Sequence, residues 1–383
     1  MRILVSADTY YPQVNGASYF TQRLAEALAA RHHEVAVIAP GTRARFLATP
    51  QGKVTFFQVP SFPIPFIHNF RFTLPGVTSY YARRVVAAWR PDIVHAQMHF
   101  TVSRAVIHVA ERQGIPMVST NHFMPDNLTH YLHLPRTLEK QLTRIAWRDC
   151  ARILMKTNII TSPTPAAARL LAEHVTKDIR AISNGIDLGR FRPHEVSTSL
   201  IQKYNLPDTF ILFVGRLDRE KNIDLVIKAM PLVTDPRIHF VIAGNGNSRK
   251  ELEALAEKGQ RERVHFLGFV PDEDLPDLYA AAKCFINMGT AELQSIVTME
   301  AMATALPIIG ANAVALPALI HTGENGVLVE PGDLQGVASA INEVFTDDER
   351  RKAMGKTSLA QIQKHNLDEV IQLYEDLYKS LLK

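Results

Sequence analysis

The chain contains 383 residues, of which 46% are hydrophobic and 21% are charged, and its formal net charge is +4 at pH 7. This length predicts two domains of about 190 residues, each able to bury a core of its own. The weak positive charge suits an anionic substrate or an anionic membrane surface and argues against a nucleic-acid partner.

The sequence carries no clear targeting signal. The N-terminal apolar run ends at Asp8 and reads as a short strand, not a signal peptide. No later stretch reaches the roughly 20 apolar residues that a membrane-spanning helix needs. Cys150 and Cys284 lie far apart beside apolar residues, which favours a reducing compartment over a disulfide framework. We therefore expect a cytoplasmic protein.

Apolar strands alternate with amphipathic helices in the N-terminal half. Helices are expected at residues 19–31 and 102–113, and strands at residues 3–6, 35–39, 93–96, 117–119 and 159–162. This alternation predicts a parallel, doubly wound α/β sheet. Ligands of such sheets bind at the carboxyl ends of the strands, so the residues that follow each strand are candidates for function.

The first strand end leads into a loop that contains Tyr11, Asn15 and Gly16. Asn-Gly is a strong turn signal. Gly16 has no Cβ, so the backbone at this point can approach a ligand closely. The residues alone leave an ordinary strand-to-helix turn equally open.

Residues 60–72 are aromatic and broken by prolines, and they predict neither a strand nor a helix. Tyrosines and arginines follow at residues 80–84. Apolar side chains beside arginines suit insertion at an anionic membrane interface. A helix expected at residues 132–156 carries a basic stripe made of Arg136, Lys140, Arg144, Arg148 and Arg152. Packing of the loop on its own domain, and a solvated helix face, remain the alternatives.

His122 follows the strand that ends at Ser119. A histidine at a strand end can hydrogen-bond a sugar hydroxyl or help to carry charge, although a lone histidine is also common as a structural residue. His95 and His99, near the preceding strand end, are weaker candidates. Asp126, a few residues further on, is a candidate carboxylate.

A domain boundary is expected after Asn184-Gly185, with a linker near residues 188–200, because Asn-Gly and the proline that follows are turn formers. The second domain then begins with a buried strand at residues 210–214, which ends at Gly215-Arg216. The planar guanidinium of Arg216 can donate paired hydrogen bonds to a phosphate, and the ammonium of Lys221 can pair with it as a compact positive charge. A charged loop with no ligand is the alternative.

Further strands are expected at residues 238–243, 264–270 and 283–287. The last of these leads through Glu292 into a helix at residues 295–304, for which Ser295 is a plausible N-cap. The first N–H groups of a helix have no partner within it, so this corner is a potential anion site. Two carboxylates near bound phosphate, at Glu292 and Glu300, would suit the hydroxyl groups of a nucleotide sugar. Two solvated glutamates are the alternative.

The run E-x7-E followed by A-M-A-x-x-x-P resembles the signature of retaining glycosyltransferases of the GT-B fold, family GT4 or glycosyl transferases group 1. The G-R-L-x-x-x-K run that begins at Gly215 resembles the same family, and the matches span nearly the whole chain. The resemblance implies an α/β, GT-B fold of two Rossmann-like, doubly wound parallel-sheet domains facing a central cleft. It also implies an acceptor-binding domain at residues 1–190, a donor-binding domain at residues 191–365, and a helix at residues 366–383 that crosses back.

The resemblance further implies site roles. Catalytic roles fall to His122, Arg216, Lys221 and Glu292. Acceptor contacts fall to Tyr11, Asn15 and Asp126. Donor contacts fall to Gly16, Gly215, Arg216, Lys221, Val270, Glu292, Leu293, Gln294, Ser295 and Glu300. No metal and no cofactor are expected, because Arg216 and Lys221 neutralise the leaving diphosphate.

The sequence departs from the family pattern at three places. Leu293-Gln294-Ser295 stands where the family usually has G-F-G, Ala305 stands where it usually has Gly, and Asn15 replaces a second Gly in the first loop. The first two departures predict a differently shaped pocket for the donor sugar.

The predicted function is retaining, metal-independent transfer of a hexose from a nucleotide sugar, UDP-glucose-like or GDP-mannose-like. The expected acceptor is a lipid such as diacylglycerol or phosphatidylinositol, met on the cytoplasmic face of an anionic membrane. A soluble sugar acceptor, a nucleotide-sugar epimerase and a nucleotide-sugar-binding protein remain alternatives. The sequence leaves the base, the hexose and the oligomeric state open.

Overall fold

The computed structural model describes residues 1–11, 15–42, 46–48, 54–63, 71–123, 136–259 and 261–383. The chain divides into two compact units. Unit 1 comprises residues 1–185 and 368–383, and unit 2 comprises residues 186–367. The division falls a few residues before the boundary at residue 190 that the sequence predicts. The expected crossing helix is α14 (Leu367–Leu381), which belongs to unit 1 from Asp368 onward.

Eight described strands of unit 1 form one sheet in the order β10-β9-β8-β7-β1-β2-β4-β3. These strands are β1 (Arg2–Ala7), β2 (Glu34–Gly41), β3 (Phe46–Ala48), β4 (Val54–Pro60), β7 (Ile93–Gln97), β8 (Met117–Thr120), β9 (Ile159–Ser162) and β10 (Ile179–Ala181). The other described α-helices of the unit are α1 (Gly16–Ala30), α2 (Pro75–Trp89), α3 (Thr101–Gln113), α5 (Arg136–Leu154) and α6 (Pro165–Ala172).

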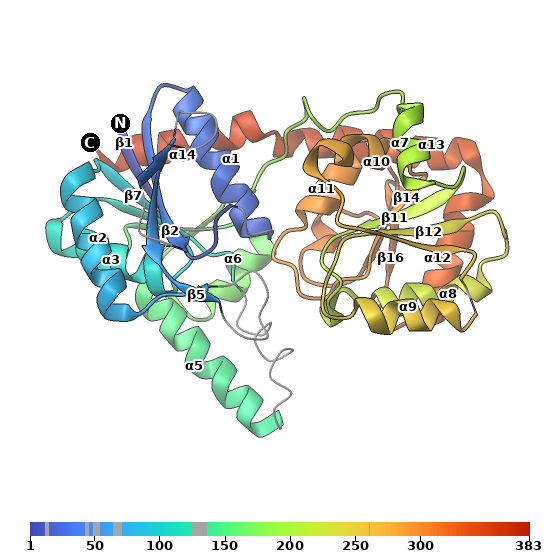
Figure 1. The fold of residues 1–383 in the computed structure, drawn as a ribbon, viewed down its shortest axis with the longest axis horizontal. Helices are drawn as coiled ribbons and strands as arrows, with labels where there is room; N and C mark the ends of the chain where they lie inside the picture. Colours follow the sequence, from blue (N-terminus) through green and yellow to red (C-terminus); the bar gives the residue numbers. More distant parts are fainter. Residues whose placement is uncertain (12–14, 43–45, 49–53, 64–70, 124–135, 260) are drawn as a thin grey trace. The chain divides into compact units, whose positions relative to one another are not determined.

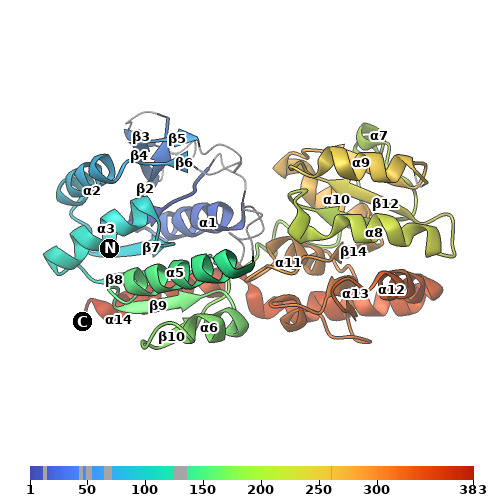
Figure 2. The ribbon, with the colours of Figure 1, turned by 90° about the horizontal axis from the view of Figure 1, so that it is seen from below.

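Every pair in this sheet is parallel except β3 with β4. On one face, Leu4 and Val94 pack in a core with Val85 of α2 and Val106 of α3. Helices cover both faces of the sheet in Figures 1 and 2, which explains why its central strands are buried along nearly their whole length. The strand order reverses between β1 and β7, so the ends of these two strands form the switch point at which ligands bind in such sheets.

Unit 2 contains a six-stranded, wholly parallel sheet in the order β13-β12-β11-β14-β15-β16. Its strands are β11 (Phe210–Val214), β12 (His239–Ala243), β13 (Val264–Gly268), β14 (Cys284–Asn287), β15 (Ile308–Ala311) and β16 (Gly326–Val329). Its helices are α7 (Thr198–Tyr204), α8 (Ile223–Ala229), α9 (Arg249–Glu257), α10 (Leu275–Ala281), α11 (Ile296–Ala303), α12 (Leu334–Thr346) and α13 (Asp348–Ile362). The two sheets confirm the predicted pair of doubly wound α/β domains.

One local prediction was wrong. Part of the stretch at residues 60–72, for which no strand was predicted, pairs as the antiparallel strands β5 (Phe62–Pro63) and β6 (Arg71–Phe72). This pairing joins residues on opposite sides of residues 64–70, so no local pattern could indicate it.

Ala305 has the left-handed backbone conformation, with φ at +59°. That conformation costs an L-residue roughly 1–2 kcal/mol, which explains why the family pattern has glycine here. The following backbone is tightly packed, since a Cβ added to Gly355 of α13 would lie 2.0 Å from the carbonyl oxygen of Ala305. The substitution therefore places strain in the turn between α11 and β15.

Helix α14 is fastened to unit 1 by a small polar cluster. Glu375 accepts from Arg31 at 3.0 Å and contacts His33 at 2.6 Å. Burial raises the pKa of the Glu375 carboxyl, but hydrogen bonds from His33 and Arg31 outweigh it and hold the pKa below its ordinary value of 4.5. Tyr374 and Tyr378 of the same helix are fully buried. The helix is thus an integral part of unit 1.

We expect Glu375→Gln to lower the free energy of unfolding of unit 1 by about 2 kcal/mol at pH 7, because Arg31 and His33 lose a charged partner. Both tryptophans of the chain, Trp89 and Trp147, lie in unit 1, so urea unfolding followed by tryptophan fluorescence measures this unit. The difference in unfolding free energy between the variant and the wild type should reach its maximum above pH 4.5. It should shrink as the pH falls, since Glu375 then takes up a proton. The exposed Glu369→Gln is the matched control, and an equal difference at pH 3 and pH 7 would contradict the assignment.

Candidate functional site

The carboxyl ends of β11 and β14 meet at the switch point of the unit 2 sheet, where the strand order reverses. The end of β11 is closely packed. Gly244, at the end of the neighbouring β12, has φ at +140°, and a Cβ there would lie 1.8 Å from the carbonyl oxygen of Gly215. Only glycine fits at position 244, and the chain leaves β11 at Gly215 directly into Arg216.

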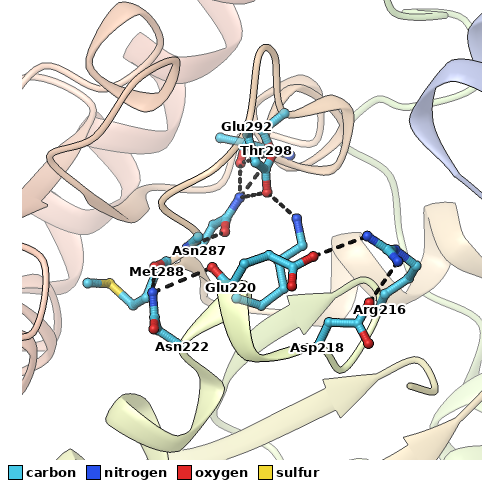
Figure 3. Close-up of polar contacts among 11 residues, drawn as sticks. Arg216, Asp218, Glu220, Asn222, Asn287, Met288, Glu292 and Thr298 are labelled. Atoms are coloured by element: carbon cyan, nitrogen blue, oxygen red, sulfur yellow. Dashed lines mark hydrogen bonds and ion pairs between the residues drawn. The ribbon is translucent and has the colours of Figure 1, made fainter. Parts of the chain in front are cut away.

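Arg216 is held by two acids of its own loop. Its guanidinium contacts Asp218 at 2.7 Å and Glu220 at 3.1 Å. Figure 3 shows the arginine side chain extended between these carboxylates. About a third of the Arg216 side chain is exposed, so its position is compatible with contact to a ligand.

Lys221 and Glu292 form an ion pair of 2.6 Å, and their side chains are only 17% and 11% exposed. Burial raises the pKa of the Glu292 carboxyl. The Lys221 charge and hydrogen bonds from Lys221, Ser295 and Asn287 outweigh burial, so the pKa lies below the ordinary value of 4.5. Glu292 is therefore ionised at neutral pH. The sequence predicted Arg216 and Lys221 as ligands of a phosphate group, and in the structure both cations are paired with acids of the chain.

Asn287 is a site residue that the sequence reasoning missed. It is the last residue of β14 and is 1% exposed. Its Nδ2 lies 3.1 Å from Glu292 Oε1 and 3.0 Å from Ser295 Oγ, while its Oδ1 accepts from the Gly289 N–H at 3.0 Å. A single amide thus orients the acid and the cap of the next helix. A polar residue at the end of an otherwise apolar strand was the available signal.

Two further contacts join the loops that follow β11 and β14. The Asn222 side chain donates to the carbonyl of Met288 at 2.9 Å, and the Thr290 N–H donates to the carbonyl of Glu220 at 3.2 Å. Asn222 adopts the left-handed conformation that ends the short turn of residues 219–221. These contacts, drawn in part in Figure 3, give the candidate site a fixed frame.

The remaining predicted donor residues of unit 2 lie around α11 and β13. Ser295 is the N-cap of α11 and accepts from the Thr298 N–H. Glu300 lies within α11, is 4% exposed and accepts from the Tyr279 hydroxyl at 3.0 Å. Leu293 and Val270 are buried, and Gln294 is partly buried. Within the described ranges, no three metal-ligating side chains gather into a cluster.

In unit 1, the first loop ends in a capping box at α1. The Ser18 N–H donates to Asn15 Oδ1 at 2.9 Å, and the Asn15 N–H donates to Ser18 Oγ at 3.2 Å. The Asn15 side chain therefore replaces a flexible glycine with a fixed cap. Gly16 is the first residue of α1, and Tyr11 is exposed. Asp126 lies outside the described residues.

His122 follows β8 in unit 1. Its Nε2 lies 2.7 Å from Gln97 Oε1, and its ring is 5.3 Å from that of Phe20. Burial lowers the pKa of His122 to about 3, so the ring is neutral and is suited to hydrogen bonding, not to carrying charge. Burial also lowers the pKa of His95 to about 3 and that of His99 to about 4. Both of these side chains lie inside the unit.

Two family models match the chain. The model described as Glycosyltransferase Family 4 matches residues 14–190, and the model described as Glycosyl transferases group 1 matches residues 197–361. The two matches together span both units.

Individual proteins are similar over most of their length. A GDP-mannose-dependent alpha-mannosyltransferase of Corynebacterium glutamicum is 28% identical, with 92% of this chain and 83% of that protein covered. An alpha-monoglucosyldiacylglycerol synthase of Acholeplasma laidlawii is 26% identical, with 85% and 84% covered. The structure of sucrose-phosphate synthase from Thermosynechococcus elongatus is similar with a TM-score of 0.85 at 21% identity, with 100% of this chain and 99% of that chain covered. This structural likeness establishes the predicted GT-B fold.

We expect Lys221→Met to lower the free energy of unfolding of unit 2 by about 3 kcal/mol at pH 7, because Glu292 is left buried without its counter-charge. Burial then raises the pKa of Glu292, so the loss should diminish as the pH falls and the carboxyl takes up a proton. Calorimetry measures the effect, with the unit 1 transition identified by tryptophan fluorescence.

The double variant Lys221→Met/Glu292→Gln is the control, since it removes both charges. It should be more stable than Lys221→Met alone at pH 7. A loss that is the same in both proteins, or that does not change with pH, would show that the two side chains do not depend on each other.

Proposed function

Because this chain belongs to glycosyltransferase family 4, also described as glycosyl transferases group 1, we propose that it transfers a hexose from a nucleotide sugar to a lipid acceptor at a membrane surface. The transfer retains the configuration at the anomeric carbon and needs no metal ion. The nucleotide sugar is GDP-mannose-like or UDP-glucose-like.

One observation carries the proposal: Lys221 and Glu292 are direct neighbours, at 2.6 Å, in a site that also contains Arg216. A ligand that replaces the pair must offer an anion to the lysine and hydrogen-bond donors to the carboxylate. A sugar joined to a diphosphate has both groups side by side. The diphosphate then pairs with Lys221 and Arg216, and the sugar hydroxyls donate to Glu292. Glu300 receives the ribose.

The bond between the anomeric carbon and the diphosphate oxygen breaks, and the acceptor hydroxyl oxygen forms the new bond on the same face. The acceptor proton passes to the departing phosphate oxygen. Arg216 and Lys221 stabilise the negative charge that develops on the leaving diphosphate, which is the role that a metal ion has in other transferases. We assign contacts with the donor sugar to His122 and Gly16 and a contact with the acceptor to Asn15.

The surface of unit 1 supports a lipid acceptor. Phe62 and Phe72 are paired across β5 and β6, and Phe62 is 61% exposed. On α5, Ile145 is 64% exposed and is flanked by the exposed Arg144 and Arg148. Exposed apolar side chains beside cations favour an anionic bilayer surface. A similar protein is named as a synthase of a glucosyldiacylglycerol. Within the described ranges, every helix is too short or too polar to cross a bilayer.

The test is release of nucleoside diphosphate from UDP-glucose or GDP-mannose, with phosphatidylglycerol vesicles that contain or lack diacylglycerol, and with or without EDTA. We expect release with one donor only, dependent on the lipid acceptor and unaffected by EDTA, and an α-linked product by NMR. Release of nucleoside diphosphate with soluble sugars alone would mean that Phe62 and Phe72 have a structural role and do not bind lipid. Donor isomerisation without an acceptor would indicate an epimerase, and binding without turnover would indicate a binding protein.

A charge-reversal variant separates membrane attachment from chemistry. Arg144→Glu/Arg148→Glu should weaken vesicle binding while leaving diphosphate affinity unchanged. Lys258→Glu/Arg261→Glu makes the same charge change at exposed positions of unit 2, and it should bind vesicles like the wild type. Equal loss in both variants would mean that net charge, not α5, determines attachment.

Glu292→Ala and Arg216→Ala should distinguish the contact with the donor sugar from the contact with the diphosphate. Glu292→Ala should reduce kcat by at least a hundredfold while calorimetric affinity for the nucleoside diphosphate stays the same or rises, because Lys221 is released to the phosphate. Arg216→Ala should weaken that affinity about tenfold, since a charge-assisted hydrogen bond contributes about 1.5 kcal/mol. Unchanged turnover in Glu292→Ala, or unchanged affinity in Arg216→Ala, would reject the corresponding role.

A further inference from the structure

His122 is the partly buried end of a chain of hydrogen bonds that runs through the interior of unit 1. Its Nε2 lies 2.7 Å from Oε1 of Gln97, which is the last residue of β7 and is 1% exposed. The Gln97 Nε2 lies 3.1 and 3.4 Å from the two ring nitrogens of His95. The Gln97 amide nitrogen therefore lies against the His95 ring, where its N–H can interact favourably with the aromatic face. This orientation turns the Gln97 oxygen toward His122, where it can only accept.

His95 is in turn tied to the C-terminal helix. Its Nδ1 lies 2.6 Å from the Tyr378 hydroxyl, and its Nε2 lies 2.7 Å from Thr120 Oγ1. Thr120 Oγ1 lies 2.7 Å from Thr161 Oγ1, whose hydroxyl donates to the Ser119 carbonyl at 3.3 Å. One assignment of protons satisfies this sequence of contacts: Tyr378 donates to His95, and His95 donates to Thr120. The Thr120 hydroxyl then donates to Thr161.

Every member of this network is uncharged at neutral pH. Burial lowers the pKa of both His95 and His122 to about 3, and burial raises the pKa of Tyr378. His95, Thr120 and Tyr378 are fully buried. A buried network that is neutral and hydrogen-bonded along its length avoids the penalty of an isolated polar group and holds its members in one arrangement.

We propose that Gln97 is a positioning residue for His122, and that α14, through Tyr378 and His95, holds Gln97 in place. By accepting from the Nε2–H, Gln97 fixes the neutral ring of His122 in the tautomer whose Nδ1 is an acceptor. An acceptor nitrogen matches a hydroxyl of the donor sugar. The inference rests on the proposed function in this respect, because the sugar supplies that hydroxyl.

The test variant is Gln97→Met, which removes the acceptor and keeps the length of the side chain. We expect kcat to fall roughly 10- to 100-fold, the range typical of losing a group that orients a metal-bound histidine. Affinity for the nucleoside diphosphate should not change, because unit 2 residues hold it. In ¹⁵N-labelled protein, the ring signals of His122, identified by their loss in His122→Asn, should move from the Nε2–H tautomer toward a mixture of tautomers. Tyr378→Phe should cause a smaller shift in the same direction.

Ser119→Ala is the matched control. Ser119 lies next to Thr120 on β8, and its hydroxyl forms a buried 2.8 Å hydrogen bond with Thr157. The variant removes this bond, which is not part of the path from Tyr378 to His122. Its kcat and His122 signals should equal those of the wild type even where its stability is lower. Thermal unfolding of each variant shows whether a fall in kcat accompanies a loss of stability or a change of the His122 tautomer.

Wild-type turnover in Gln97→Met together with unchanged His122 signals would overturn the inference. A tautomer shift with reduced kcat supports it. If His122→Asn turns over like the wild type, the role of His122 in the proposed function fails, and the tautomer measurement still decides whether Gln97 orients the ring. The two failures are therefore distinguishable.

Discussion

The ion pair between Lys221 and Glu292 is the interaction on which the candidate site of unit 2 depends. It joins the loops that follow β11 and β14, and both partners are largely buried. Together, Arg216 and Lys221 face three carboxylates, those of Asp218, Glu220 and Glu292, so both cations already have acidic partners without a ligand. Inorganic phosphate that drew Lys221 away would leave Glu292 buried and without its cation, which is unfavourable. Under the proposed function, a ligand with an anion and hydroxyl groups would satisfy both partners.

The candidate residues of the two units differ in charge. In unit 2 they carry formal charges, which Asn287 and the cap at Ser295 hold in place. In unit 1 the candidate His122 is neutral, because burial disfavours the imidazolium. Under the proposed function, a neutral ring would not oppose the positive charge that develops on the anomeric carbon as the diphosphate departs, and it would keep a hydrogen-bonding nitrogen.

Regular elements with strong periodicity were predictable, and pairings between distant side chains were not. The strands that end at Val214 and Asn287 follow from apolar runs bounded by glycine and polar residues, and the cap at Ser295 follows from local chemistry. The support of His122 by Gln97 joins positions 25 residues apart, which only the sheet register brings together. The ion pair of Lys221 with Glu292 spans 71 positions. The sequence named both Lys221 and Glu292 as candidates. It could not show that they pair with each other, because that pairing depends on β11 and β14 being neighbours in the sheet.

Helix α14 makes unit 1 discontinuous along the chain, and this has a consequence for biosynthesis. The sheet of unit 1 is encoded before residue 185, whereas Tyr374 and Tyr378, which are buried in unit 1, are made after the whole of unit 2. At 5–20 residues per second, the delay is on the order of ten to forty seconds. During that time the nascent unit 1 exposes the side chains that α14 later covers, while the continuous unit 2 completes its own core. The half of the protein that is translated first is therefore the half whose core is completed last.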